Sequence, residues 1–89
     1  MRELFFKELA LTDQRGEERR YAYYVVIDEM DVGPFSCESY GLRVEERGGE
    51  SAVVPHITCS IPRIDELCEL VAEGGVTPAT LRDVVNDWL

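Results

Sequence analysis

The chain has 89 residues and a mass of 10.1 kDa, which excludes two domains and any large barrel or full dinucleotide-binding fold. Hydrophobic residues make up 45% and charged residues 30%, so the composition is that of a globular domain and not of a disordered chain. Asp and Glu number 18 against 9 Lys and Arg, and the net charge of −9 repels phosphate backbones. General nucleic-acid binding is therefore disfavoured.

The sequence predicts a cytoplasmic protein without a membrane segment. Its longest apolar stretches, such as residues 23–27, have the length of a strand, whereas a membrane-spanning helix needs about 20 apolar residues. Residues 1–8 include acids where a signal peptide would carry its apolar region. The three cysteines, Cys37, Cys59 and Cys68, lack the spacing of a disulfide framework, so we expect free thiols in a reducing cytosol.

The first third of the chain is typical of strands. Residues 4–11 favour a strand over a helix, although their alternation is imperfect, and a polar turn follows at 12–18. Residues 20–28 give the clearest strand, because they are rich in Tyr, Val and Ile. Apolar side chains lie on both faces of this segment, which suits a central strand. Residues 29–34 are predicted to form a loop closed by a Gly-Pro pair.

Two further strands are predicted around a glycine turn. Residues 35–46 alternate in hydropathy, and Gly41 within them indicates a β-bulge or a close approach of another backbone segment. Residues 47–50 contain two glycines and form a hairpin turn. Residues 51–59 are the fourth strand, and Pro55 predicts that it lies at an edge or is kinked, since proline has no N–H for the ladder.

The last third of the chain changes to helical periodicity. Apolar residues recur three or four positions apart over 61–71, with acids on the opposite face. We expect Ser60 to cap this helix at its start and a Gly-Gly pair to end it. Thr77 and Pro78 are then predicted to begin a second helix. The apolar stripe of that helix consists of Leu81, Val84, Val85 and Trp88.

Together these elements predict one α+β domain over residues 1–89. A four-stranded antiparallel sheet (1–59) is followed by a C-terminal αα-hairpin (60–89) packed on one face, in the order ββββαα. Two short helices cover only one face of a sheet, and the second strand is apolar on both. The other face therefore needs further cover, from the first strand or from a partner.

The only histidine and the thiols are the candidates for chemistry. His56, Cys59 and Cys37 supply the ligand types of a zinc site, but no C-x-x-C pair is present. His56 is also the only histidine that could activate a thiol, yet reflection about the glycine turn places Cys37 near residue 60, several positions from His56. Burial in a core is common for free cysteine. We therefore expect no cofactor, metal or catalytic residue, with a metal-binding or thiol-dependent enzyme as the alternative.

The tyrosines of the second and third strands are the candidates for an interaction surface, because tyrosine is enriched at protein interfaces. They are Tyr21, Tyr23, Tyr24 and Tyr40. Residues 1–20 carry five acids and five bases, whereas residues 21–89 carry the whole charge of −9. A partner guided by charge would therefore present a basic protein surface. Stacking of RNA bases on the tyrosines is a third reading, which the charge disfavours.

The C-terminal half of the chain contains recognisable motifs. These are Tyr-Gly-Leu at 40–42, Leu-Cys-Glu-Leu-Val at 67–71, and an ending at 75–89 with the pattern Val-x-Pro-x-x-Leu-x-Asp-Val and a final Asp-Trp-Leu. They resemble a family of small bacterial proteins of unknown function, apart from Asn86, where that family tends to have an acid. The resemblance implies strands followed by two helices, occurrence in Gram-positive bacteria, and docking of Trp88 into the core. It implies no activity, cofactor or site residue.

The sequence thus predicts a non-enzymatic protein-interaction module that associates with itself or with a basic protein surface. The small size of the domain and the second strand with two apolar faces favour this function over the alternatives.

Overall fold

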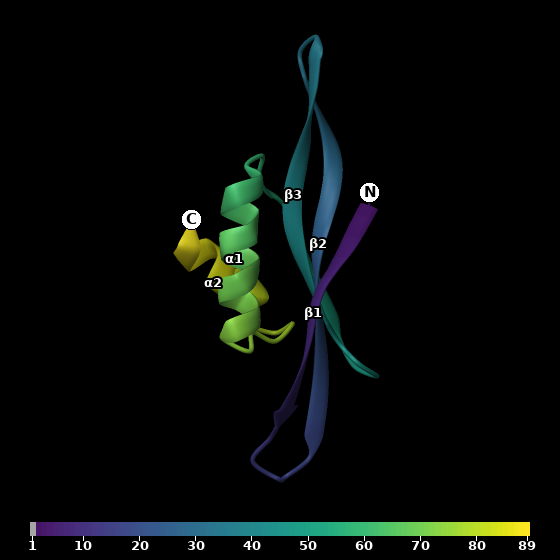
Figure 1. The fold of residues 1–89 in the computed structure, drawn as a ribbon, viewed down its shortest axis with the longest axis vertical. Helices are drawn as coiled ribbons and strands as arrows, with labels where there is room; N and C mark the ends of the chain where they lie inside the picture. Colours follow the sequence, from purple (N-terminus) through teal and green to yellow (C-terminus); the bar gives the residue numbers. More distant parts are fainter. Residues whose placement is uncertain (1) are drawn as a thin grey trace.

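A computed structural model describes residues 2–89, except for the side chain of Val32, and shows one sheet with two helices on one of its faces (Figure 1). The elements are β1 (Arg2–Thr12), β2 (Glu18–Val32), β3 (Phe35–Glu46), β4 (Ser51–Thr58), α1 (Ile61–Glu73) and α2 (Leu81–Trp88). The strands pair in the order β1-β2-β3-β4, and every pair is antiparallel. The predicted α+β class and the order ββββαα are confirmed. No helix among these residues is long and apolar enough to cross a membrane.

The hairpin of β2 and β3 extends well beyond the helices (Figure 1). The prediction of a loop at 29–34 is wrong, because cross-strand pairing continues from Glu29 opposite Glu38 to Val32 opposite Phe35. Only Gly33 and Pro34 form the turn, and the positive φ of 65° at Gly33 suits a tight hairpin. The molecule is consequently elongated, with extents of 54 × 24 × 18 Å. We call residues 29–36 the arm.

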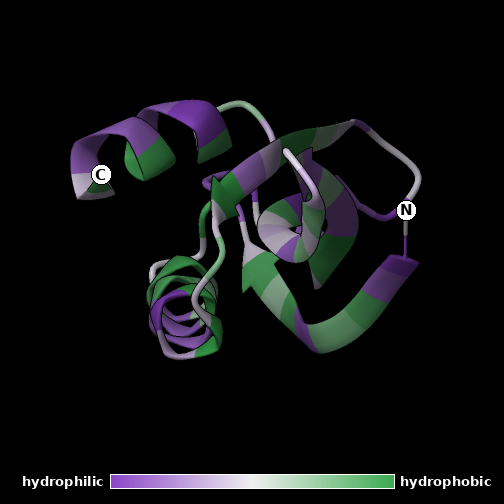
Figure 2. Cartoon of the chain, turned by 90° about the horizontal axis from the view of Figure 1, so that it is seen from above, coloured by the Kyte–Doolittle hydropathy of each residue, from purple (hydrophilic) through white to green (hydrophobic). Residues whose placement is uncertain are grey.

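The hydrophobic core lies between the helices and one face of the sheet, which we call the inner face; Figure 2 shows both helices on that side. Alternate residues of β2 and β3 point into it, and the fully buried helix residues Leu67, Leu81 and Val85 meet them. Tyr23 is buried here, and its hydroxyl donates a 2.9 Å hydrogen bond to the carbonyl oxygen of Val76, in the turn between the helices. This bond fixes the helical hairpin against the centre of the sheet. Trp88 packs at the margin of the core, partly exposed, with Arg63 above its ring.

The helix ends follow the predicted signals in part. The Ser60 hydroxyl accepts a hydrogen bond from the Arg63 N–H, and α1 ends at Gly74, as predicted. The second helix begins later than predicted, because the Thr80 N–H bonds the Thr77 carbonyl in a tight turn. The first bond of α-helical spacing runs from Val84 to Thr80, so α2 proper starts at Leu81.

β4 crosses over β3 at Gly41. The pairing of β3 with β4 jumps from Leu42–Val54 to Tyr40–Thr58, which leaves a bulge of three residues on β4 opposite Gly41. A side chain at Gly41 would collide with the Val54 carbonyl oxygen and with Pro55. The predicted bulge or close approach at Gly41 is therefore confirmed, and Pro55 lies in an edge strand.

Candidate functional site

A run of consecutive exposed apolar residues lies on the edge strand β1. β1 pairs only with β2, so one side of its backbone has no partner strand among residues 2–89. Leu4, Phe5 and Phe6 are 58%, 60% and 39% exposed. Three consecutive large apolar side chains at this exposure on an open strand edge form the kind of surface that pairs with another chain.

The cross-strand register places these side chains on both faces of the sheet. Leu4 lies opposite Val25, which points into the core, whereas Phe5 lies opposite Tyr24 on the other face, which we call the open face. A β-bulge between Phe5 and Lys7 shifts the register. Beyond it, Leu9 lies opposite Tyr21 and again faces the core. The apolar residues of β1 can therefore contact a partner on the inner face and on the open face of the sheet.

On the inner face, β1 and α1 border a groove of about 300 Å³. Its apolar lining includes Leu4 from the strand, Tyr40 from the floor of the sheet, and Ile61 and Ile64 from the helix. Ile61 is 58% exposed, so the apolar surface of β1 continues onto the beginning of α1. A smaller hollow of about 210 Å³, which Phe6 lines, follows further along the same seam.

On the open face, Tyr24 is held between two side chains. The Phe5 ring meets the Tyr24 ring edge-on at a centroid distance of 5.7 Å, and the Arg43 guanidinium lies 4.2 Å from the Tyr24 ring centroid. Glu3 accepts hydrogen bonds from both Arg43 Nε and Nη2, at 3.0 and 2.8 Å. The hydrogen bond with Glu3 raises the pKa of Arg43, so the guanidinium is charged at every physiological pH. The contacts among Tyr24, Arg43 and Glu3 therefore fix the position of the Phe5 ring on the open face.

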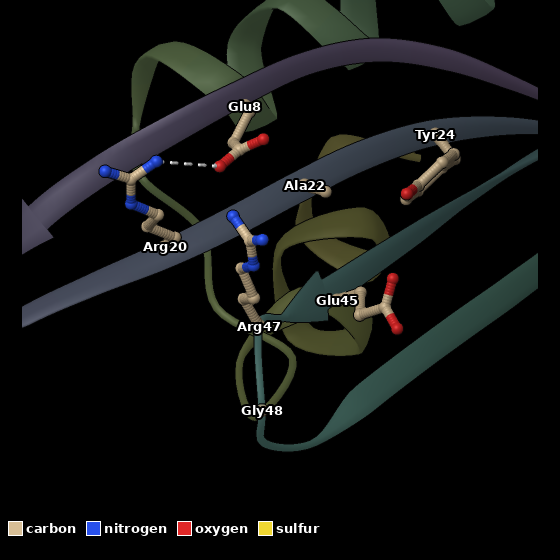
Figure 3. Close-up of a pocket in the computed structure, with 7 residues that line it drawn as sticks. All are labelled: Glu8, Arg20, Ala22, Tyr24, Glu45, Arg47 and Gly48. Atoms are coloured by element: carbon tan, nitrogen blue, oxygen red, sulfur yellow. Dashed lines mark ion pairs between the residues drawn. The ribbon is translucent and has the colours of Figure 1, made fainter.

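A pocket of about 230 Å³ lies beside this cluster (Figure 3). Arg20 and Arg47 border it together with Glu8, Glu45 and Tyr24, and Arg20 forms a 3.6 Å ion pair with Glu8. Two guanidinium groups are thus balanced by two carboxylates. The pocket has no excess of positive charge that would favour an anion.

His56 contacts a carboxylate and not a thiol. Its Nε2 atom lies 3.3 Å from Oδ2 of Asp28 on β2, so the side chain reaches across β3, on which Ser39 is the partner of Asp28. His56 has a φ of 55°, a strained backbone conformation for a residue that is not glycine. The crossing covers the open face here, and Val26, opposite Gly41, is only 1% exposed.

The thiols are separated into a pair and a single buried residue. Cys37 Sγ lies 3.9 Å from Cys59 Sγ, and both residues are exposed. Cys68 is buried in the core, where burial raises its pKa to about 12. Among residues 2–89, no group of three His, Cys, Asp or Glu side chains is arranged to hold a metal ion. The structure thus brings Cys37 and Cys59 together and places His56 with Asp28.

Comparison with known proteins agrees with this description at the level of family. Residues 2–89 match a family of unknown function, DUF6514. The chain belongs to this family. Neither the curated proteins nor the solved structures include a match to it. The family of unknown function predicted from the C-terminal motifs is confirmed in that general form, and the match covers the strands as well as the helices.

The structure corrects the tyrosine interface predicted for this DUF6514 chain. Tyr21, Tyr23 and Tyr40 are buried between the sheet and the helices, because all three point to the inner face. Only Tyr24 is on the open face, and Phe5 and Arg43 flank it. The β-propensity of residues 20–28 correctly predicts a central strand. It does not predict which face of that strand the helices cover.

Sequence reasoning missed β1 as the candidate surface of this DUF6514 chain. The available signal was the segment Arg-Glu-Leu-Phe-Phe-Lys-Glu at 2–8, in which large apolar residues stand between charged pairs. Edge strands commonly carry charges that limit aggregation, so such a segment is typical of an exposed strand and not of a buried one.

Proposed function

We propose that this DUF6514 chain is a non-enzymatic protein-interaction module that dimerises through β1. The observation that carries the proposal is the exposed apolar edge at Leu4, Phe5 and Phe6, which joins the groove beside α1. The occupant that we propose is the β1 strand of a second copy, aligned antiparallel to the first. The combined sheet would then continue across the two molecules.

The sequence of β1 is complementary to itself in this arrangement. When two copies align about Phe5, Arg2 lies opposite Glu8, Glu3 opposite Lys7, and Leu4 opposite Phe6. Leu4 and Phe6 therefore bring apolar side chains together across the strands. Because of the bulge between Phe5 and Lys7, Glu3 and Glu8 lie on the open face whereas Arg2 and Lys7 lie on the inner face, so the opposite charges attract across the strand edge without forming direct pairs. Lys7 forms no ion pair with any residue in 2–89, so its ammonium is available to attract the carboxylates of the second copy.

The distribution of charge supports contact at this edge. Two molecules of charge −9 repel each other, but residues 1–20 carry five acids and five bases and contribute nothing to that excess. β1 is thus the part of the sheet at which two copies approach with least repulsion. The other edge strand, β4, contains Pro55 and a bulge, which disfavour pairing. Pairing through β1 alone gives a closed dimer with twofold symmetry.

The size of the apolar surface predicts a moderate affinity. The exposed fractions of Leu4, Phe5 and Phe6 are 58%, 60% and 39%, which together equal about one and a half fully exposed side chains. Their burial contributes ~3 kcal/mol per copy. Ladder hydrogen bonds add about 1 kcal/mol each, against an association cost of roughly 4–15 kcal/mol. We therefore expect a Kd on the order of micromolar.

The test is the oligomeric state of the full chain by sedimentation velocity over a range of concentrations that spans this Kd. We expect Phe5→Lys to raise the Kd about 100-fold, because each copy loses ~1–2 kcal/mol of apolar burial and the interface contains two copies. The matched control is Phe35→Lys, since Phe35 is 75% exposed at the tip of the arm, away from β1. A monomeric wild-type chain, or equal weakening by both substitutions, would contradict the proposal.

A further inference from the structure

A pair of surface thiols stands where the arm joins the body of the molecule. Cys37 lies on β3, opposite Met30 of β2, and Cys59 directly follows the last residue of β4. The pairing of Tyr40 with Thr58 brings the two cysteines to diagonal positions on neighbouring strands. The resulting separation of their Sγ atoms is 3.9 Å.

We propose that Cys37 and Cys59 are a site of reversible oxidation that forms an intramolecular disulfide. A bonded pair needs its sulfurs about 2 Å apart, so the side chains must approach by a further ~2 Å, which rotation about their χ1 angles can supply. Both residues are exposed, so a small oxidant has access to them. The remaining adjustment falls on Cys59, which follows the last residue of β4 and has no partner in the register of β3 with β4.

The oxidant that this chemistry needs is a small-molecule disulfide. One cysteine thiolate attacks a sulfur of the reagent, the reagent S–S bond breaks, and one thiolate of the reagent leaves. The second cysteine thiolate then attacks the first cysteine sulfur, which forms the protein S–S bond and releases the other half of the reagent. The two reagent thiolates take up the two protons that the cysteines lost. Two electrons pass from the protein to the reagent.

The third cysteine of the chain supplies an internal comparison. Cys68 is 1% exposed, and burial raises its pKa to about 12, so it is protected both from contact and from ionisation. The pKa of Cys37 is also raised, chiefly by its hydrogen bond with Cys59. The rate of cross-linking should therefore increase as the pH rises, since more of the Cys37 thiol becomes thiolate.

The cross-link would fasten the base of the arm to the start of α1. Cys59 precedes Ser60, the N-cap of α1, and Cys37 precedes Glu38, which lines the groove together with Ile61. The disulfide would close a loop between residues 22 positions apart. A loop of this length constrains the unfolded chain enough to raise the Tm on the order of 10 °C.

The test is treatment of the dilute full-length protein with oxidised glutathione, followed by tryptic mapping without reduction. The sequence places the three cysteines in separate tryptic peptides, at 21–43, 48–63 and 64–82. We expect loss of two hydrogen atoms from the protein mass, linkage of the first two peptides, the higher Tm, and reversal of all three by dithiothreitol. The yield should not depend on protein concentration, because both thiols belong to one chain.

The control variants separate this pair from general thiol reactivity. Cys37→Ser should carry one glutathione on Cys59, with no cross-link and no rise in Tm, whereas Cys68→Ala should cross-link as the wild type does. The proposal is overturned if wild-type Cys37 and Cys59 each carry glutathione, if the linked peptide contains Cys68, or if links form only between copies. It does not depend on dimerisation through β1.

Discussion

The register of the proposed dimer can be tested by exchanging charges between two copies. In the alignment about Phe5, Glu3 of each copy lies at the same level as Lys7 of the other, on the opposite face of the sheet. Lys7→Glu alone places two pairs of acids at the same level in its homodimer, and Glu3→Lys alone places two pairs of bases there. A heterodimer that contains one copy of each variant has two pairs of opposite charge again. Each variant should therefore associate more weakly alone than with the other.

The expected difference follows from the exposure of these positions. Both residues are exposed and lie on opposite faces, so each pair of charges contributes only about 0.2 kcal/mol, favourable or unfavourable. Two unfavourable pairs replaced by two favourable ones amount to ~0.8 kcal/mol, or roughly fourfold in Kd. Glu3→Lys also removes the ion pair between Glu3 and Arg43 within its own copy. That loss occurs twice in the Glu3→Lys homodimer and once in the heterodimer, so an additive effect of it cannot by itself favour the mixed species over the average of the two homodimers.

Native mass spectrometry of an equimolar mixture, with one variant labelled with ¹⁵N, measures the three dimers directly. Random association gives about half heterodimer, so charge complementarity requires a clear excess over that share. A mixture of Arg82→Glu with Glu50→Lys, both outside β1 and both exposed, is the matched control and should remain near random. A random distribution for the Glu3 and Lys7 variants would refute this register.

Two further predictions concern the fold. Gly41→Ala should lower the free energy of unfolding by about 1–3 kcal/mol, because the added methyl group meets the Val54 carbonyl and Pro55, and the Tm should fall accordingly. Gly49→Ala, which meets only the flexible Glu46 side chain, should cost much less, and equal losses would argue against the crossing at Gly41. Burial raises the pKa of Tyr23 and of Cys68 to about 12, so stability should be intact below about pH 9 and decline as the pH approaches 12. In urea unfolding against pH, Cys68→Ala should remove the part of the decline that begins near pH 9 and Tyr23→Phe the part that begins near pH 10, and an unchanged slope in both would contradict this origin.

The elements could be predicted from the sequence wherever hydropathy and turn residues agree. The strand at 35–46, the bulge at Gly41 and the cap at Ser60 follow from local signals, and all three are present. The arm could not be predicted, because its residues look like a polar loop. These residues form strands because the pairing of β2 with β3 continues as far as the turn at Gly33, and strand propensity alone does not predict that pairing.

The candidate surface was harder to predict, because it depends on which face of the sheet the helices cover. Tyr21 and Tyr23 are of a residue type that is common at interfaces, yet they lie in the core. The odd-numbered residues of β2 face α1 and α2, and both tyrosines are among them. Phe5 is of a residue type that is common in cores, yet it is exposed, because no helix covers the open face (Figure 1). Parity along a strand groups residues on a face, but only tertiary packing assigns that face to solvent or to the interior.

The arm affects how cooperatively the molecule unfolds. Its residues, 29–36, pair only within the hairpin of β2 and β3, and the helices pack elsewhere, against the core. Opening the arm from its tip therefore exposes little buried surface and leaves the core intact, whereas opening β2 at Tyr23 requires the helical hairpin to leave the sheet. Local fraying and global unfolding are thus separate processes within a single pair of strands, with their boundary where β4 crosses at Gly41.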